Sequence, residues 1–323
     1  MEQYKQEFKP IISVAMVVYN HEKYLDHALQ SIFEQKISVP FEVVIGEDCS
    51  QDSSREIIDQ WKNRYPEIIK PLYREHNIGM VKNVNEVIFS CQGEYVAWLE
   101  GDDYWTDKEK LQKQLFFLQN HREAYIGVLH NAQVVDADER PCPQHQNNYP
   151  IRKEQDFVWK DFQKGYMPGQ TATFFYRNIF TDMDEQEKAL FWNCHANGDS
   201  SIICVLLLYG KLKIMPDVMS AYRLVASGAS NWHSIAAGKN YSLVYYQKIL
   251  DLEKLSESLL GRKKELNGWR YRSFASALLQ AYKDPTPKNK EILENIWSME
   301  NHKLGACLYC GKLALKHIFA PTS

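Results

Sequence analysis

Apolar runs typical of buried strands alternate four times with helical patterns in the first 120 residues. The four runs cover residues 11–18, 41–45, 71–73 and 95–99. After the first run, Leu25 opens a series of apolar residues spaced as on one face of a helix, and comparable patterns follow the other runs. Because crossover helices join parallel strands, this alternation predicts an α/β fold with a mainly parallel central sheet.

Local signals predict where these helices begin and end. Ser53 and Thr106 each precede a glutamate by three positions, which is the pattern of a capping box at a helix start. Gly93 follows the third helical pattern and is expected to stop that helix.

The alternation weakens after about residue 127. We expect strands over residues 128–135 and 171–176. Residues 141–150 are expected to form a surface loop, and residues 201–209 a buried helix. Beyond about residue 235 the periodicity is helical and is interrupted by Pro285 and Pro287. The last third is therefore expected to be a helical region attached to the α/β part.

Composition narrows the class of protein. A net charge of −3 gives no electrostatic basis for a nucleic-acid partner. The polar N-terminus is unlike a secretory signal, and the longest apolar runs fall short of the ~20 residues needed to span a bilayer. Seven scattered cysteines form neither a disulfide framework nor a zinc motif. These features predict a reduced, cytoplasmic protein.

Polar residues follow each of the four strand-like runs, at 19–22, 46–50, 74–79 and 100–104. In an open α/β sheet, ligands bind outside the carboxyl ends of the strands, so these residues should converge on one site. The fourth group contains adjacent carboxylates, which suit a hard cation better than they suit simple solubility.

The order and spacing of these motifs resemble those of the family 2 glycosyltransferases, which have the GT-A fold. The resemblance rests on residues 13–20, 47–53, 77–79 and 99–103, and covers about residues 10–235. It implies an inverting transfer of a sugar from a nucleoside-diphosphate sugar, with UDP as the expected nucleotide. The acceptor would be a hydroxyl of a glycan or lipid-linked molecule in surface polysaccharide synthesis, and a divalent metal, Mn²⁺ or Mg²⁺, would lie on the diphosphate.

The resemblance also implies a division of the chain. Residues 1–235 would form the catalytic domain, with a nucleotide-binding half over 10–120 and an acceptor half over 121–235. Residues 236–323 would form the helical C-terminal region. The oligomeric state is not predicted.

The paired acids are the expected metal site. By resemblance, Asp103 would be the direct ligand, Asp102 would bind the ribose or help to hold the metal, and Glu100 is close enough to assist. A cation held there would stabilise the negative charge of the departing diphosphate. The alternative interpretation is that adjacent acids at a helix start only favour the helix dipole.

The nucleotide would lie beside these acids. By resemblance, Asp48 would accept from the N–H of a pyrimidine ring, and Tyr19 would lie against the base. Four further residues are expected to line the same pocket or to approach the phosphates, namely Asn20, Glu47, Asn77 and Lys82. The alternatives are strand-end packing for Tyr19 and a solvated helix position for Lys82.

An inverting reaction also needs a general base to take the proton of the attacking hydroxyl. Asp199, just ahead of the buried helix at 201–209, matches the family's position for it, although an aspartate there also suits a helix cap. Arg223, Trp232 and His233 are expected near the acceptor or the diphosphate. Where the family often has a histidine after a tyrosine–arginine pair, this chain has valine. Either His233 substitutes for that histidine or the metal has only acidic and phosphate ligands.

Two other functions fit parts of the pattern. A sugar nucleotidyltransferase would normally show a glycine-rich phosphate loop near the N-terminus, and residues 11–24 contain no glycine. A non-catalytic sugar-nucleotide-binding module would be indicated by loss of the metal acids or the base, and these are present.

Peripheral contact with the inner face of a membrane is a further hypothesis. The basic residues Arg262, Lys263, Lys264, Arg270 and Arg272 and the tail at 313–319 could rest on anionic lipid. Solvated helix faces are the alternative explanation.

Overall fold

The computed structural model describes residues 9–143, 153–194, 198–225 and 240–319, without the side chains of 315–319. A nine-stranded mixed sheet forms its centre, in the order β3-β2-β1-β4-β8-β6-β9-β5, with β7 paired to β9. The strands are β1 (Ile12–Val18), β2 (Phe41–Glu47), β3 (Ile69–Tyr73), β4 (Tyr95–Trp98), β5 (Tyr104–Trp105), β6 (Tyr125–Val135), β7 (Gln155–Phe157), β8 (Phe175–Arg177) and β9 (Lys211–Arg223).

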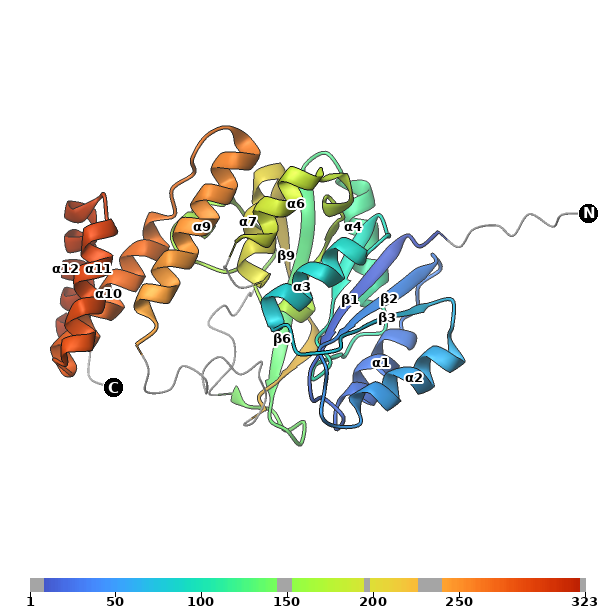
Figure 1. Ribbon diagram of the computed structural model, residues 1–323. Coiled ribbons are helices and arrows are strands. Elements are labelled where there is room, and N and C mark those ends of the chain that lie inside the picture. The colour runs from blue at the N-terminus through green and yellow to red at the C-terminus, as the bar shows by residue number, and fades with distance from the viewer. Residues whose placement is uncertain (1–8, 144–152, 195–197, 226–239, 320–323) are drawn as a thin grey trace, which may run out of the picture.

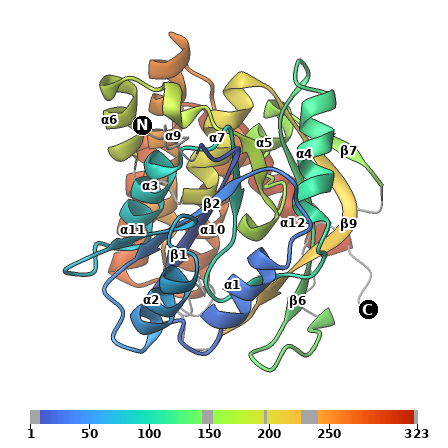
Figure 2. The ribbon, with the colours of Figure 1, turned by 90° about the vertical axis from the view of Figure 1, so that its right-hand side faces the viewer.

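The helices cover both faces of this sheet and continue beyond it (Figures 1 and 2). In the first half they are α1 (Leu25–Phe33), α2 (Ser54–Arg64), α3 (Met80–Ser90) and α4 (Lys110–Asn120). Later come α5 (Trp159–Gln163), α6 (Glu185–Trp192), α7 (Gly198–Tyr209), α9 (Ser242–Leu260), α10 (Asn267–Lys283), α11 (Pro287–Met299) and α12 (Lys303–Phe319). The predicted α/β fold with a helical C-terminal region is confirmed.

The first four strands of the sheet order are parallel, as the alternating pattern predicts. β1 pairs in parallel with β2 and β4, and β2 pairs in parallel with β3. β8 then runs antiparallel to both β4 and β6, so the parallel arrangement ends at β4. The carboxyl ends of the parallel strands consequently lie at one edge of the sheet.

Alternation along β1 divides the core into two layers. Val14 and Met16 pack with α1 and α2 on one face, whereas Ala15 packs with α3 and α7 on the other. Figure 2 shows α1 and α2 on the opposite side of the sheet from α3. Both faces are therefore buried, which explains why the strand sequences are nearly continuous apolar runs.

The capping boxes predicted at Ser53 and Thr106 do not form. Ser53 makes no side-chain cap bond, and α4 begins at Lys110 rather than directly after Thr106. In each case a neighbouring aspartate, Asp52 or Asp107, accepts the backbone N–H two residues ahead, at 3.0 Å and 2.8 Å. The aspartate side chain in the preceding turn therefore accepts a backbone N–H, as the hydroxyl of Ser53 or Thr106 was expected to do.

Gly93 does not end α3, which stops at Ser90. A Cβ atom on Gly93 would lie 2.5 Å from the backbone nitrogen of Ser13, so the glycine is needed where the chain passes close to β1. The strand expected over 171–176 is also shifted, because residues Thr171–Thr173 form a 3₁₀ turn and only Phe175–Arg177 pair with the sheet.

The long strand β9 has no counterpart in the sequence predictions. It contains Pro216, which usually argues against a central strand. Pro216 falls where the register between β6 and β9 shifts, between the Leu129–Ile214 and Asn131–Val218 pairs. The proline is tolerated because the ladder is already interrupted at that point.

Helix α9 connects the sheet to the outer helices. It packs on α7 on one side and on α10 on the other, and α10 to α12 extend away from the sheet (Figure 1). Tyr246, Phe274, Ile292, Ile296 and Ala306 form a separate apolar core among these four helices.

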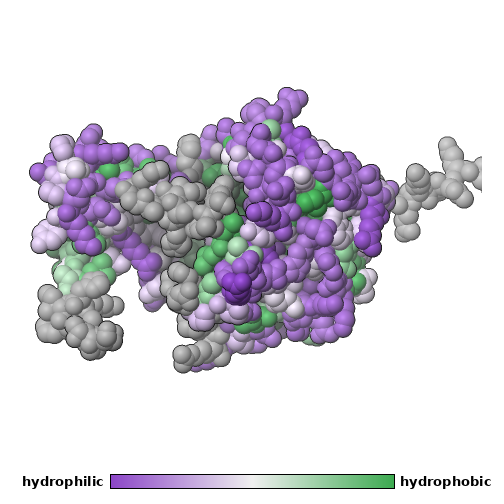
Figure 3. Space-filling model, turned by 90° about the horizontal axis from the view of Figure 1, so that it is seen from below, coloured by the Kyte–Doolittle hydropathy of each residue, from purple (hydrophilic) through white to green (hydrophobic). Residues whose placement is uncertain are grey.

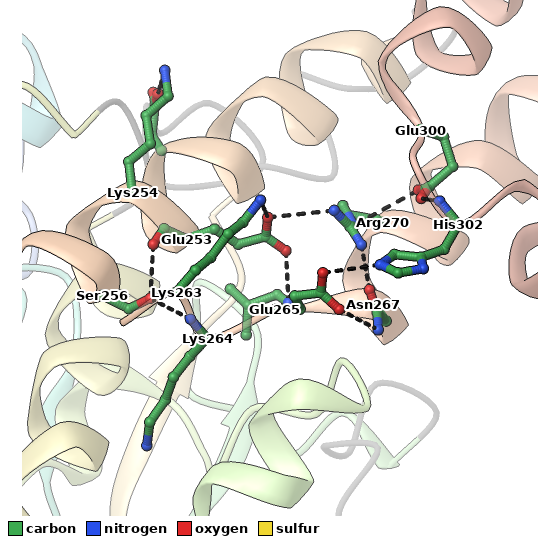
Figure 4. Close-up of polar contacts among 12 residues, drawn as sticks. Glu253, Lys254, Ser256, Lys263, Lys264, Glu265, Asn267, Arg270, Glu300 and His302 are labelled. Carbon is green, nitrogen blue, oxygen red and sulfur yellow. Dashed lines mark hydrogen bonds and ion pairs between the residues drawn. The ribbon is translucent and has the colours of Figure 1, made fainter. Parts of the chain in front are cut away.

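A buried ionic network ties the C-terminal helices together (Figure 4). Arg270 of α10 lies between two acids, with Nη1 3.4 Å from Glu253 Oε2 and Nε 3.7 Å from Glu300 Oε2. The hydroxyl of Tyr246 donates to Glu300 at 2.9 Å, and the amide of Leu266 donates to Glu253 at 2.7 Å. All three charged side chains are fully buried, and Lys263 Nζ reaches Glu253 Oε2 at 3.2 Å from the surface. Glu300 therefore depends on Arg270 for its compensating charge, and Glu253 shares Arg270 with Lys263.

Most of the basic residues proposed for membrane contact form contacts within the protein. Four of these five residues contact the protein itself, namely Lys263 with Glu253, Lys264 with Trp159, Arg270 with the two acids, and Arg272 with Gly165. Figure 3 shows some hydrophobic surface among the C-terminal helices. Leu304 and Leu308 of α12 are exposed. Within the described ranges, no helix is both long and apolar enough to cross a membrane. Membrane contact stays a prediction.

We predict that Arg270→Met destabilises the protein by about 3–5 kcal/mol, because it leaves the buried Glu300 without a cation and Glu253 with Lys263 alone. Urea unfolding followed by circular dichroism measures this free energy. The matched control is Lys254→Met on exposed α9 surface, which should change stability by less than about 0.5 kcal/mol. Equal unfolding midpoints for both variants would show that the network does not stabilise the C-terminal helices.

Candidate active site

The strand ends and the start of α3 enclose one cleft. Residues from the carboxyl ends of β1, β2 and β4 and from α3 line it, among them Tyr19, His21, Asp48, Asn83, Glu100 and Asp102. The structure thus brings together polar groups that are far apart in the sequence, as the parallel topology implies.

Asp48 holds the loop that follows β3. Its carboxylate accepts the backbone N–H groups of Ile78 at 2.7 Å and Gly79 at 3.0 Å, and Asn77 Nδ2 donates to its carbonyl at 3.2 Å. Gly79 has a φ of 86°, a conformation that favours glycine. A carboxylate has about four acceptor positions, so Asp48 can still bind a ligand donor in the cleft.

The loops after β1 and β2 brace each other. Asn20 and Cys49 both adopt left-handed backbone conformations, with φ of 58° and 59°. The Asn20 amide donates to Ser50 Oγ at 3.0 Å, and Asn20 Oδ1 accepts from the Gln51 amide at 2.8 Å. Asn20 therefore shapes the edge of the cleft through its contacts with the neighbouring loop.

Glu47 lies behind the cleft and is not among its lining residues. Its fully buried carboxylate accepts from the Ser50 amide at 2.6 Å and from Arg55 Nε at 2.8 Å. The structure therefore places the Glu47 side chain beneath the loop that follows β2, where it supports that loop. Lys82 is exposed on the first turn of α3.

The acids after β4 are held by β9. Asp102 and Asp103 are 4% and 1% exposed, and Asp103 Oδ1 accepts from the Arg223 amide at 2.8 Å. Asp103 Oδ2 is buried and has no hydrogen-bond partner among the described residues. The side chain of Glu100 lies beside those of Asp103 and Thr171.

Crowding of negative charge shifts the pKa values of this group. Burial and the charges of Asp102 and Asp199 raise the pKa of Glu100 to about 8. Burial and the charges of Asp102 and Glu100 raise the pKa of Asp103 well above its usual value. Burial and the surrounding acids also raise the pKa of Tyr222. The negative charge of this acidic cluster is therefore not fully compensated by neighbouring positive charge.

Asp199 occupies the first turn of α7 and faces this cluster. Its Oδ1 accepts from the amide of Ser200 at 2.6 Å, and burial raises its pKa while the nearby Lys248 of α9 opposes the shift. The structure thus brings Asp199 within electrostatic range of Glu100, as the general-base hypothesis requires.

Arg223 stabilises the turn that carries Asp102 and Asp103. Its Nη1 donates to the carbonyl of Asp102, its Nη2 lies 2.7 Å from Glu139, and its guanidinium lies 4.5 Å from the ring centroid of Tyr24. These contacts bury the Arg223 side chain next to the turn that carries Asp102 and Asp103. Trp232 and His233 lie outside the described residues.

His21 and Asn83 are site residues to which the sequence assigned no role. Asn83 Nδ2 donates to the Gly46 carbonyl at 2.8 Å, whereas its buried Oδ1 lacks a partner among the described residues. His21 Nε2 lies 3.8 Å from Asp102 Oδ2, and within the described part its buried Nδ1 also has no partner. His21 follows the first strand directly, which is a usable signal, whereas Asn83 sits in a helical pattern that gives none.

Comparison with known proteins identifies the fold and the family. The structure is similar to TarS of S. aureus, residues 1–349 in complex with UDP-GlcNAc, with a TM-score of 0.61, 18% identity and coverage of 88% of this chain and 79% of that one. It also resembles the mannosyltransferase PcManGT of Pyrobaculum calidifontis in complex with GDP-Man and Mn²⁺, with a TM-score of 0.52, 15% identity and coverage of 97% and 88%. The expected GT-A-type fold is confirmed.

Relatives found by sequence are more nearly identical to this chain than these two structures are. An uncharacterized protein of Mycobacterium tuberculosis is 29% identical over 224 residues, which are 69% of this chain but only 61% of that protein. An uncharacterized glycosyltransferase of Nostoc is 30% identical over 228 residues, covering 70% of this chain and 68% of the relative. Residues 13–180, more than half of the chain, match the model of glycosyl transferase family 2. Together these matches show that the chain belongs to glycosyl transferase family 2.

Proposed function

We propose that this protein is an inverting, metal-dependent glycosyltransferase. It moves a sugar from a nucleoside-diphosphate sugar, with UDP as the expected nucleotide, to a hydroxyl of a glycan or lipid-linked acceptor in surface polysaccharide synthesis. The observation that carries this proposal is the cluster of Glu100, Asp102, Asp103 and Asp199 at the open end of β4, beside a cleft with unsatisfied polar groups. The similar TarS structure, solved with UDP-GlcNAc, supports the donor class.

The cleft offers complementary groups to a nucleoside. Tyr19 would lie against the base, since an aromatic ring has a flat apolar face. Asp48 would accept from a ring N–H with a carboxylate oxygen that also holds the 78–79 loop. The free Asn83 Oδ1 would accept a further donor, because a buried carbonyl oxygen without a partner is costly.

The acidic cluster fits a divalent cation. The buried Asp103 Oδ2 has no partner in the described part of the chain, and carboxylate oxygens are the ligands that Mg²⁺ and Mn²⁺ prefer. Within the described ranges no three His, Cys, Asp or Glu side chains come together to hold an ion unaided. Asp103 and Asp102 would therefore hold it jointly with the donor diphosphate, and the bound ion would neutralise charge on the leaving group. The Mn²⁺ in the similar PcManGT structure is consistent with this site.

Asp199 would act on the acceptor. As a general base it would take the proton from the attacking hydroxyl while that oxygen forms the new bond and the diphosphate leaves. One displacement inverts the anomeric carbon. Its raised pKa makes it a stronger base, and Lys248 limits the rise so that the carboxylate stays available. Hydrolysis or transfer assays with a panel of sugar nucleotides and Mn²⁺ test the whole proposal through release of nucleoside diphosphate.

We predict that Asp103→Ala abolishes Mn²⁺-dependent binding of the donor nucleotide while leaving the fold intact. The change removes the carboxylate with the unpaired oxygen and leaves the backbone contact from Arg223 without a partner. Calorimetric titration of UDP with and without Mn²⁺ measures the effect. Unchanged Mn²⁺-dependent affinity would remove Asp103 from the metal site.

Glu100 should make the metal-free protein less stable as pH rises. Its folded pKa of about 8 lies above its ordinary 4.5, so the folded protein keeps a proton that the unfolded chain releases between these values. Stability should therefore fall from about pH 4.5 to pH 8 in EDTA, and Glu100→Gln should flatten part of that fall. Melting temperatures measured across this range test it, with exposed Glu123→Gln as the control. A wild-type profile retained by Glu100→Gln would contradict the assignment.

Asp199→Asn should separate chemistry from binding. A base acts on the acceptor in the transition state, so kcat should fall by ~10²–10⁴-fold while donor affinity stays near normal. Asparagine keeps the size of the side chain and can still accept the Ser200 amide, so the helix start is preserved. Turnover at the wild-type rate with both substrates saturating would show that Asp199 serves only the helix.

A further inference from the structure

A second cavity lies between α9 and α10, away from the donor cleft. Its volume is about 310 Å³, at the lower end of the range of about 300–1,000 Å³ for small-molecule sites. Helix α9, which forms one wall of the cavity, also packs on α7 beside the sheet.

The walls of this cavity combine aromatic faces with uncharged hydrogen-bonding groups. The aromatic residues are Tyr241, Tyr245 and Trp269, and the hydroxyl and amide groups are those of Ser273, Ser276 and Gln280. No aspartate or glutamate is among its described lining residues. The indole N–H of Trp269 already donates to the carbonyl of Phe162 at 2.6 Å, so this ring is fixed in place.

This lining matches the two kinds of surface on a pyranose ring. The C–H face of a sugar is apolar and slightly positive, and it packs against the negative face of an aromatic ring. The hydroxyl groups around its rim would bond to Ser276 and Gln280. A phosphate would need free cations. Arg272, the one cation among the described lining residues, already donates to the Gly165 carbonyl and stacks on Tyr166. An acyl chain would have no use for the polar groups.

Helix α9 carries both a wall of the cavity and a neighbour of the proposed general base. Tyr245 lines the cavity, and Lys248, one turn further along α9, has its Nζ 5.9 Å from the ring centroid of Tyr245. Lys248 is also within electrostatic range of Asp199.

We propose that the cavity between α9 and α10 is an acceptor subsite that binds a pyranose unit of the glycan acceptor. The bound unit would be separate from the sugar that carries the reacting hydroxyl. This inference rests on the proposed glycosyl transfer and adds to it the chemical class of the acceptor and the place where it is held.

Saturation-transfer NMR with methyl β-glycosides of glucose, galactose and N-acetylglucosamine tests the subsite. At least one glycoside should bind at millimolar concentration, with the strongest transfer to its ring C–H protons. Tyr245→Ala should weaken that binding by roughly tenfold, as expected for loss of a stacked ring. Ser276→Trp should also abolish it, because an exposed residue of the rim is replaced by a side chain that fills the cavity.

The matched control is Tyr282→Ala, since Tyr282 lies on α10 outside the cavity and is 84% exposed. It should bind the glycosides like the wild type. Failure of all three glycosides to bind, or equal binding by the wild type, Tyr245→Ala and Ser276→Trp, overturns the subsite. Release of nucleoside diphosphate by the wild type is measured separately, so that loss of the proposed function and loss of the subsite give different results.

Discussion

Repulsion among the carboxylates at the end of β4 is the constraint on which the rest of the site depends. Glu100, Asp102 and Asp103 lie together directly after β4, and Asp199 is near them on α7. Burial and mutual charge raise the pKa values of Glu100 and Asp103, and burial raises the pKa of Asp199. Packing and backbone hydrogen bonds must hold such a cluster, because its own electrostatics oppose it. β9 supplies that support, since the Arg223 amide binds Asp103 and its guanidinium holds the Asp102 carbonyl.

The loops that line the cleft are braced by contacts with one another. Asp48 clamps the loop after β3, and Glu47 with Arg55 supports the loop after β2 from behind. Two left-handed residues, Asn20 and Cys49, turn the chain sharply after β1 and β2. Such conformations are costly and persist only where the surroundings enforce them. The cleft therefore meets its ligand preorganised, which reduces the entropy lost on binding.

The C-terminal helices contribute to the site through α9. This helix brings Lys248 beside Asp199 and forms one wall of the second cavity, so its position relative to α7 affects both. That position is fixed on its outer side by the buried contacts of Arg270 with Glu253 and Glu300. The ionic network, distant from the cleft, therefore helps to set the geometry between the proposed base and the proposed acceptor subsite.

The sequence by itself determined the parallel half of the sheet, its covering helices and the gathering of acids at one edge. These features follow from local periodicity. A strand buried on both faces and a helix buried on one face each have a characteristic spacing of apolar residues along the sequence. Only the tertiary structure decided that β9 continues past Pro216 and that Arg223 is buried. It also decided that Glu47 lies behind the cleft and that Asn83 lines it. Each of these depends on contacts between residues far apart in the chain or on a helix facing a neighbouring loop, and no local pattern encodes such pairings.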